Sequence, residues 1–341
     1  MNLRSGTHYL LGRNFSIFSN TRYVRLLVPM GLQVVTGGAG FIGSHVVERL
    51  LRDGERVIVV DDFSSGKETN IEGLRGCQNL RVERASILDV EILSRLFRGA
   101  EFVFHLAAVP SVQKSLEHPL RSNDANIGGT LAVLLAARDA GVKRVVYASS
   151  SSVYGDSETL PKREEFPAQP LSPYALQKYV GEMYAHMFYN LFGTGSASLR
   201  YFNVFGPRQD PTSEYSAVIP RFITAMLQGR SPVIYGDGEQ SRDFTYVENV
   251  VEANILAARS HEAAGRVMNI ALGDRVSLNE LVALLNKILG TSIRPVYEAP
   301  RAGDVRHSQA AVEQARQLIG FQPSIDFRTG LERTIDWYRK N

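Results

Sequence analysis

Short apolar runs of strand length alternate with longer amphipathic segments from Leu32 onward. Leu32–Thr36 is an apolar run, and Arg56–Val60 is nearly all apolar, as expected of a strand buried on both faces of a parallel sheet. Between them, Ser44–Asp53 has the periodicity of an amphipathic helix, which Gly54 would end. Strands that alternate with helices pair in parallel through right-handed crossovers. The pattern therefore predicts a doubly wound α/β fold.

The same alternation continues to about residue 202. It predicts further strands at Leu80–Glu83, Glu101–His105, Arg144–Ala148 and Ser196–Tyr201, and further helices at Val90–Arg98, Asp124–Ala140 and Pro173–Phe192. From about residue 203 proline, glycine and polar residues become more frequent, and Ser277 with Glu280 forms a capping box for a helix that ends before Gly290. We expect residues 30–202 to form the sheet domain, with about 243–270 returning to it. Residues 203–341 would form mainly a smaller C-terminal lobe.

The composition excludes several classes of protein. Of the 341 residues, 44% are hydrophobic and 21% charged, which is typical of a soluble globular chain and not of a disordered one. The apolar run Leu131–Ala137 is far shorter than the roughly 18 residues that a membrane-spanning helix needs, so no membrane partner is expected. The single cysteine, Cys77, excludes an internal disulfide and a cysteine-based metal site, and we expect no bound metal. These features fit a cytoplasmic protein.

The positive charge of the chain is concentrated at its start. Lys and Arg number 38 against 35 Asp and Glu, a net charge of +3, and residues 1–29 contain four arginines and no Asp, Glu or Lys. The remainder therefore carries −1 and offers no basic stripe for a nucleic acid. Residues 1–29 have three interpretations: a disordered tail, a start codon assigned too early, or a targeting peptide.

A glycine-rich segment, Thr36–Gly43, joins the first strand to the first helix. Gly37 would permit a tight turn, Gly40 would let a pyrophosphate approach the backbone, and Gly43 would let the helix pack on the sheet. Asp61 ends the second strand 18 residues after Gly43. A carboxylate there accepts hydrogen bonds from a ribose 2′-OH and repels a 2′-phosphate. The segment predicts a Rossmann-type domain that binds NAD rather than NADP.

A second motif carries acid–base chemistry. Ser172 and Pro173 suit the N-cap and first position of a helix on which Tyr174 and Lys178, four residues apart, share one face. A lysine ammonium near a phenol lowers the pKa of the phenol, which suits Tyr174 as a general base. The serine run 149–152 follows a strand, and one of its hydroxyls would bond the substrate and the tyrosine. The motif by itself leaves open which serine this is.

Four motifs together resemble the extended short-chain dehydrogenase/reductase family. They are Gly37-x-x-Gly40-x-x-Gly43, His105-Leu106-Ala107-Ala108, Tyr174-x-x-x-Lys178 and the run Leu199–Pro207. Within the family the chain is similar to the nucleotide-sugar 4-epimerases, those of UDP-glucose and UDP-N-acetylglucosamine. The similarity covers about residues 32–337 and leaves out residues 1–29.

The resemblance implies the residues of the site. Catalysis would rest on Tyr174 and Lys178 with Ser150, which stands three residues before Val153 as in relatives with a Ser-x-x-Val-Tyr-Gly run. His105 is expected to be a packed strand-end histidine instead. The implied cofactor site consists of Gly37, Gly40, Phe41, Ile42, Gly43, Asp61, Ser86, Ile87, Ala107, Ala108, Val109, Asn126, Tyr174, Lys178 and Phe202. The implied substrate site consists of Ser150, Tyr174, Asn203, Val233, Ile234, Tyr235, Arg242, Arg301, Asp304 and Ser308.

The resemblance also implies the reaction, which is an NAD-dependent 4-epimerisation of UDP-hexoses through a 4-keto sugar. Small Ser308 favours acceptance of UDP-GlcNAc and UDP-GalNAc beside UDP-Glc and UDP-Gal. The family's dehydratases and decarboxylases carry an acid just before their Tyr-Gly pair, whereas here Ser151, Ser152 and Val153 precede Tyr154. UDP-glucuronate 4-epimerase and a non-catalytic NAD-binding regulatory member remain as alternatives. The roles would lie in nucleotide-sugar metabolism, as in galactose metabolism or polysaccharide biosynthesis.

The resemblance finally implies a homodimer. In the family, two helices of each subunit pair into a four-helix interface. The corresponding helices here, 124–140 and 173–192, have more apolar residues than one sheet face can cover, among them Leu131, Leu134, Tyr184, Met187 and Phe188.

Overall fold

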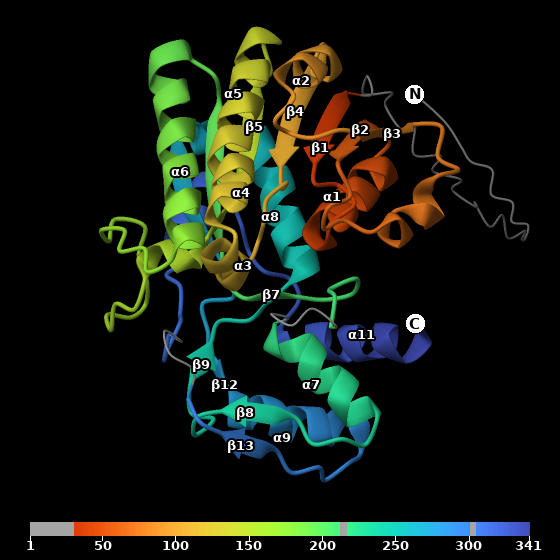
Figure 1. Ribbon diagram of the computed structural model, residues 1–341, viewed down its shortest axis with the longest axis vertical. Helices are drawn as coiled ribbons and strands as arrows, with labels where there is room; N and C mark the ends of the chain where they lie inside the picture. The colour runs from red at the N-terminus through yellow and green to blue at the C-terminus, as the bar shows by residue number, and fades with distance from the viewer. Residues whose placement is uncertain (1–30, 212–216, 301–304) are drawn as a thin grey trace, which may run out of the picture. The chain divides into compact units, whose positions relative to one another are not determined.

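Seven parallel strands form the central sheet of the computed structural model, which describes residues 31–211, 217–300 and 305–341 (Figure 1). In spatial order they are β3 (Leu80–Arg84), β2 (Arg56–Asp61), β1 (Leu32–Thr36), β4 (Ala100–His105), β5 (Arg144–Ser150), β6 (Ser196–Tyr201) and β11 (Arg266–Ile270). The order reverses between β1 and β4. Such a reversal leaves a crevice at the carboxyl ends of the strands, where doubly wound sheets bind ligands. The predicted Rossmann-type fold is confirmed.

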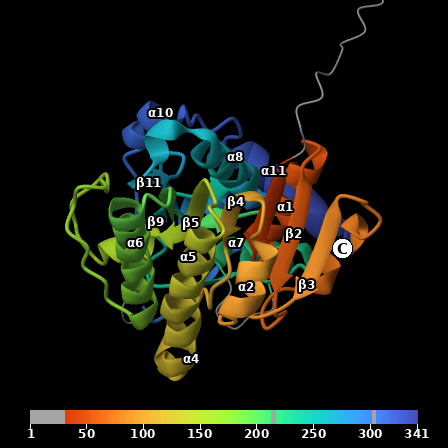
Figure 2. The ribbon, with the colours of Figure 1, turned by 90° about the horizontal axis from the view of Figure 1, so that it is seen from above.

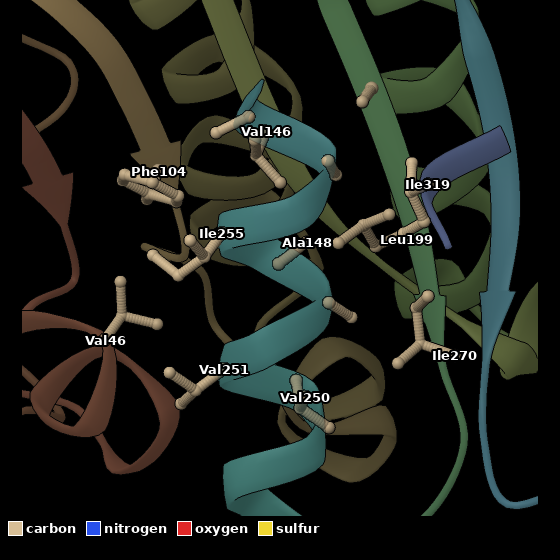
Figure 3. Packing of buried hydrophobic residues seen from close by; sticks show 14 of the residues in the cluster. Val46, Phe104, Val146, Ala148, Leu199, Val250, Val251, Ile255, Ile270 and Ile319 are labelled. Atoms are coloured by element: carbon tan, nitrogen blue, oxygen red, sulfur yellow. The ribbon is translucent and has the colours of Figure 1, made fainter. Parts of the chain in front are cut away.

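Helices cover both faces of this sheet (Figure 2). One face carries α1 (Phe41–Arg52), α8 (Val247–Arg259) and α10 (Glu313–Ile319), and the other carries α2 (Val90–Leu96), α5 (Gly129–Asp139) and α6 (Pro173–Phe192). On the first face, Val250, Val251 and Ile255 of α8 point toward the sheet (Figure 3). Successive strand residues such as Val34 and Val35 pack on opposite faces of the sheet because side chains alternate along a strand.

A second core lies under the short strands and helices that follow β6. Phe205, Phe222, Ile234 and Leu281 are buried there together. The elements are β7 (Val204–Phe205), α7 (Val218–Leu227), β8 (Val233–Tyr235), β9 (Ser241–Arg242), β10 (Thr245–Tyr246), β12 (Val276–Ser277), α9 (Leu278–Leu289), β13 (Val296–Glu298) and α11 (Phe327–Lys340). The strands pair two by two as β10–β7, β12–β9 and β13–β8.

Capping residues recognised in the sequence predicted several helix ends correctly. Ser277 and Glu280 make the reciprocal hydrogen bonds of a capping box, and Gly290 ends α9 in the left-handed conformation. Ser172 caps α6 through the Ala175 N–H, with Pro173 in the first turn.

Two predicted helices begin differently from those observed. Helix α1 begins at Phe41, three residues before the predicted start, because the first turn is built on the glycine segment and carries little apolar periodicity. The segment expected as one helix from 124 to 140 begins with a π-helical turn, Asp124–Gly128. It follows α4 (Pro119–Asn123) and continues into α5. The remaining short helices are α3 (Val112–Glu117), η1 (Glu68–Asn70), η2 (Glu72–Leu74), η4 (Ser151–Tyr154) and η5 (His261–Ala263).

Within the described residues, no helix is both long and apolar enough to cross a membrane. The predicted tail, residues 1–29, lies outside this part of the chain, as do Arg301 and Asp304.

Candidate active site

Two adjoining cavities open at the carboxyl ends of the sheet strands. The first, of about 550 Å³, is lined by the glycine segment and is called here the glycine cavity. The second, of about 490 Å³, is lined by serines 149–152 and is called the serine cavity. Both are lined by Tyr174, Ser149 and Tyr201, so a ligand in one meets a ligand in the other beside Tyr174.

The floor of the glycine cavity is formed by glycines at positions where a side chain would clash with the backbone. Gly37 has φ +71°, and a Cβ there would lie 2.6 Å from the Ala107 backbone nitrogen. A Cβ on Gly43 would overlap the Gly37 carbonyl oxygen. Helix α1 starts at this floor with Gly40 as N-cap and without a side-chain cap or an acidic residue in its first turn. Its first N–H groups are therefore available to an anion, and the dipole of the helix favours one.

Asp61 stands at the far side of the same cavity. One carboxylate oxygen accepts a hydrogen bond from the Ala39 N–H at 2.9 Å, and the other accepts one from the Phe63 N–H at 2.8 Å. Burial raises the pKa of Asp61, and these two hydrogen bonds oppose that rise. The carboxylate is thus fixed at the end of β2 with its remaining lone pairs at the cavity.

Tyr174 and Lys178 lie on the face of α6 that packs on β5. The Lys178 ammonium donates to the Ala148 carbonyl at 2.8 Å and lies 6.0 Å from the centre of the Tyr174 ring. Burial lowers the pKa of Lys178 to about 8. The pKa of Tyr174 is raised by burial, and its hydrogen bond with Ser150 opposes the rise. The net shift of the Tyr174 pKa in the protein alone is therefore upward, opposite in direction to the lowering expected from Lys178.

The serines at the end of β5 have different partners. Ser150 Oγ hydrogen-bonds the Tyr174 side chain and accepts from the Ser152 N–H at 3.2 Å. Ser149, in contrast, donates its hydroxyl to the buried carboxylate of Glu182. Of these two residues, Ser150 is the one placed to share a substrate hydroxyl with Tyr174.

The serine cavity brings together part of the predicted substrate site. Ser150, Tyr174, Asn203, Arg242 and Ser308 line it, and Phe202 lies here rather than in the glycine cavity. Arg242 donates to the carbonyls of Ser241 and Arg306. Among the described residues that line the serine cavity there is no Asp or Glu, whereas Lys162 and Arg242 are present. The charge of this cavity favours an anionic ligand.

Several predicted residues are not brought to a cavity wall. Val233, Ile234 and Tyr235 form β8 and line neither cavity, and Ile234 is completely buried in the second core. Ser86 also lines neither, although Ile87 beside it lines the glycine cavity with Ala107, Ala108 and Val109. For Ser86 the reason is alternation, since its neighbours Ala85 and Ile87 both line the glycine cavity.

Two further residues considered in the sequence lie behind the cavity walls and do not line them. Asn126, in the π-helical turn, accepts a hydrogen bond from the Val109 N–H at 2.8 Å and donates to Gln177 at 2.8 Å. It therefore holds the cavity wall rather than forming it. His105 is 1% exposed and bonds Thr36 at 2.8 Å and Thr130 at 3.0 Å. Burial lowers the pKa of His105 to about 3, so it is a neutral packed histidine.

Known proteins share this arrangement. Residues 33–271, more than half of the chain, match the model of the NAD dependent epimerase/dehydratase family. The chain belongs to this family. UDP-glucose 4-epimerase of Mycolicibacterium smegmatis is 38% identical over 90% of this chain and 98% of its own length.

Two solved structures are similar to it. UDP-N-acetylglucosamine 4-epimerase from Methanobrevibacter ruminantium M1, in complex with UDP-N-acetylmuramic acid, is 42% identical with a TM-score of 0.88. UDP-glucose 4-epimerase from Thermotoga maritima, with UDP-glucose, is 40% identical with a TM-score of 0.86. Each covers 91% of this chain and 99% of the other. The family predicted from the motifs is confirmed.

The cofactor of the epimerase/dehydratase family fits the glycine cavity. The uncapped start of α1 suits a diphosphate, and Asp61 suits a ribose diol, because each leaves donors or acceptors facing the cavity. Asp62 follows Asp61 along the same wall, so a 2′-phosphate would meet two carboxylates. NAD therefore fits better than NADP.

We expect Asp61→Asn to lower the affinity for NAD about tenfold, because one charge-assisted hydrogen bond to the ribose is lost. The preference for NAD over NADP would fall with it. Titration of the nucleotide-free protein with each dinucleotide measures both effects. Asp336→Asn, on α11, is the control, and equal affinities in the parent and in Asp61→Asn would remove Asp61 from the cofactor site.

The sequence motifs did not indicate three basic residues that line the glycine cavity and one that lines the serine cavity. Lys67, Lys114 and Arg208 line the former, and Lys162 lines the latter. Lys67 pairs with Asp210 at 2.8 Å, and Arg208 pairs with Glu48 at 2.6 Å. Lys67, Lys162 and Arg208 lie in loops and Lys114 lies in the short helix α3, so no local pattern identifies them before the chain is folded.

Proposed function

We propose that this protein is an NAD-dependent UDP-hexose 4-epimerase. The observation that carries the proposal is the position of Tyr174, hydrogen-bonded to Ser150, where a cavity fit for NAD meets a cavity lined by cations. A UDP-sugar has a diphosphate for such cations and a sugar to place at Tyr174. Serines 151 and 152 stand before Val153 and Tyr154, where a dehydratase or decarboxylase would need an acid.

The side chains supply position and proton control. NAD, when bound, supplies a hydride acceptor and the positive charge of its nicotinamide ring. Tyr174 takes the proton of the sugar 4-OH and later returns it, while Ser150 orients that hydroxyl. Lys178 supplies the positive charge that stabilises the phenolate form of Tyr174. Arg242 contacts the diphosphate, as Arg301 is predicted to do, and Asp304 is predicted to accept hydrogen bonds from the ribose hydroxyls.

The serine cavity also sets the sugar class. Ser308 lines it with a small side chain. We expect room there for the acetamido group of UDP-GlcNAc and UDP-GalNAc, so both the acetylated and the plain pair would be substrates.

Proton NMR of UDP-Glc, UDP-GlcNAc and UDP-GlcA incubated separately with the protein tests the proposal. Appearance of the 4-epimer of UDP-GlcNAc or UDP-Glc supports it. Conversion of UDP-GlcA alone would instead indicate a UDP-glucuronate 4-epimerase. This activity is the second candidate because the cationic Lys162 lines the serine cavity, where it could pair with a sugar carboxylate. Bound NAD without any turnover would indicate a regulatory member of the family.

We further propose that two copies associate through α6. Leu134 and Phe188, expected at the interface, lie in the core at 1% and 5% exposure, so the predicted set was partly wrong. An exposed apolar stripe nevertheless follows one face of α6 at helical spacing, formed by Leu176, Met183, Met187 and Leu191. Leu120 on the neighbouring α4 is 80% exposed. Such a continuous apolar patch is typical of a subunit interface.

Light scattering at micromolar concentration should give twice the mass of one chain. Replacing Met187 and Leu191 together by glutamate should give a single-chain mass, because two charges would be buried at the interface. Lys287→Glu, at an exposed position of α9, is the control. A monomeric parent would contradict this prediction.

A further inference from the structure

A buried ion pair lies beneath the junction of the two cavities. Glu182 and Arg200 are 3% and 4% exposed. The guanidinium donates from Nε to one carboxylate oxygen at 2.9 Å and from Nη2 to the other at 2.7 Å. Ser149 donates its hydroxyl to the same carboxylate. Two planar bonds and a hydroxyl hold the Glu182 carboxylate in one orientation.

The Arg200 side of the ion pair packs against a residue of the serine cavity wall. The Arg200 guanidinium lies 4.7 Å from the centre of the Tyr154 ring, and the Tyr154 hydroxyl donates to Asn269 at 2.7 Å. Ser149 and Tyr154 both line that cavity. The network therefore reaches the wall of the substrate site without contributing a charged group to it.

The buried surroundings of Lys178 disfavour a charged side chain. It is 4% exposed, and its ammonium has the Ala148 carbonyl as hydrogen-bond acceptor and the Tyr147 ring centre at 5.1 Å. Burial lowers its pKa, and Glu182, one helical turn further along α6, is the group that opposes this. The other titratable groups around it are Tyr174 on α6, Tyr147 on β5 and His105 on β4. His105 is neutral, and burial raises the pKa of Tyr147 well above its ordinary value.

We propose that Glu182 is a positioning residue for the epimerisation, the anion that keeps the Lys178 ammonium charged beneath Tyr174. Arg200 holds the Glu182 carboxylate in one orientation through two hydrogen bonds, and Glu182 offsets the positive charge of Arg200 near Lys178. A buried ion pair contributes little net stability, because desolvation offsets its attraction. Its retention directly under the proposed acid–base residues is explained by its electrostatic effect on Lys178. The inference rests on the proposed function.

The test compares three variants that disturb the pair differently. Glu182→Gln removes the anion and keeps the shape, Glu182→Asp keeps the anion, and Arg200→Met breaks the same ion pair while leaving the carboxylate. The first readout is the pH profile of kcat/KM for UDP-GlcNAc. The second is the ionisation of Tyr174, measured without turnover from the phenolate absorbance of each protein minus that of its Tyr174→Phe counterpart.

In Glu182→Gln the alkaline limb of the profile should move down by about one pH unit, since Lys178 loses an opposite charge nearby. Tyr174 should ionise at correspondingly higher pH, and KM should change less than about threefold. Glu182→Asp should keep the parent profile, and Arg200→Met should show no downward shift.

Several outcomes overturn the inference. One is an alkaline limb of the kcat/KM profile that stays at the parent's pH in Glu182→Gln. Another is a shift of this limb to lower pH that is equal in Glu182→Gln and Arg200→Met, which would indicate that the ion pair is merely structural. If Glu182→Gln does not fold, a downward shift in Arg200→Met would still refute the proposal, and a parent-like profile there would support it. A parent that epimerises no UDP-sugar refutes the proposed function instead, and the Tyr174 titration then decides on Glu182.

Discussion

Replacing Tyr174 by phenylalanine should lower kcat for 4-epimerisation by at least about 10²-fold, the range expected for a lost general base. The variant keeps the ring that lines both cavities and loses the hydroxyl that bonds Ser150. Fold and bound NAD should therefore be retained. Single-substrate kinetics with UDP-GlcNAc and UDP-Glc, together with the NAD content of the purified protein, measure the effect.

Tyr189→Phe is the matched control, because Tyr189 lies on the same helix, is 37% exposed and lines neither cavity. Its turnover should equal that of the parent. Activity of Tyr174→Phe within a few-fold of the parent would remove the hydroxyl from the mechanism. A loss of NAD in that variant would assign the effect to the cofactor site.

The environment of Tyr174 shows why the cofactor matters to this residue. Burial raises the pKa of Tyr174 and lowers that of Lys178 to about 8, so burial disfavours the charged form of both side chains. A neutral phenol cannot act as a base, and positive charge at the site has to offset the cost of burying a phenolate. Lys178 supplies part of this charge and Glu182 supports it, which places the acid–base function in the folded network rather than in the Tyr-x-x-x-Lys motif alone.

The fold was largely readable from the sequence because buried parallel strands appear as uninterrupted apolar runs. The predicted bounds of β1, β6 and α6 coincide with the observed ones. The π-helical turn at Asp124–Gly128 could not be predicted, since it keeps the periodicity of a helix and is set by the bonds of Asn126 to Val109 and Gln177. Likewise, α10 packs on a sheet whose preceding strand ends more than 40 residues earlier.

The site was readable where its residues are neighbours in the chain. The glycine segment and the pair Tyr174 and Lys178 are local motifs with a mechanism of their own. Glu182 pairs with Arg200 across two elements, and Lys162 reaches the serine cavity from a loop, so no spacing indicates either. Strand β8, predicted to contact the substrate, lines neither cavity, and its central residue, Ile234, belongs to the second core.

Ser308 occupies a constrained part of the serine cavity wall. Its N–H donates to the Ser241 carbonyl at 3.0 Å, and the neighbouring His307 ring bonds the Ser241 hydroxyl at 2.9 Å. The segment is therefore held against β9, which also carries Arg242. A larger side chain at 308 would project from a fixed backbone, and a packed wall relaxes little around it.

Ser308→Tyr should consequently lower kcat/KM for UDP-GlcNAc and UDP-GalNAc by about 100-fold, since a phenol ring would fill the space of the acetamido group. UDP-Glc and UDP-Gal lack that group, so their kcat/KM should stay within about threefold of the parent's. Parallel kinetics on both pairs measure the ratio. Ser308→Ala should retain both activities, and Ser292→Tyr, in an exposed loop, controls for the added ring. Equal losses on both pairs, or a parent inactive on UDP-GlcNAc, would show that another residue determines the sugar class.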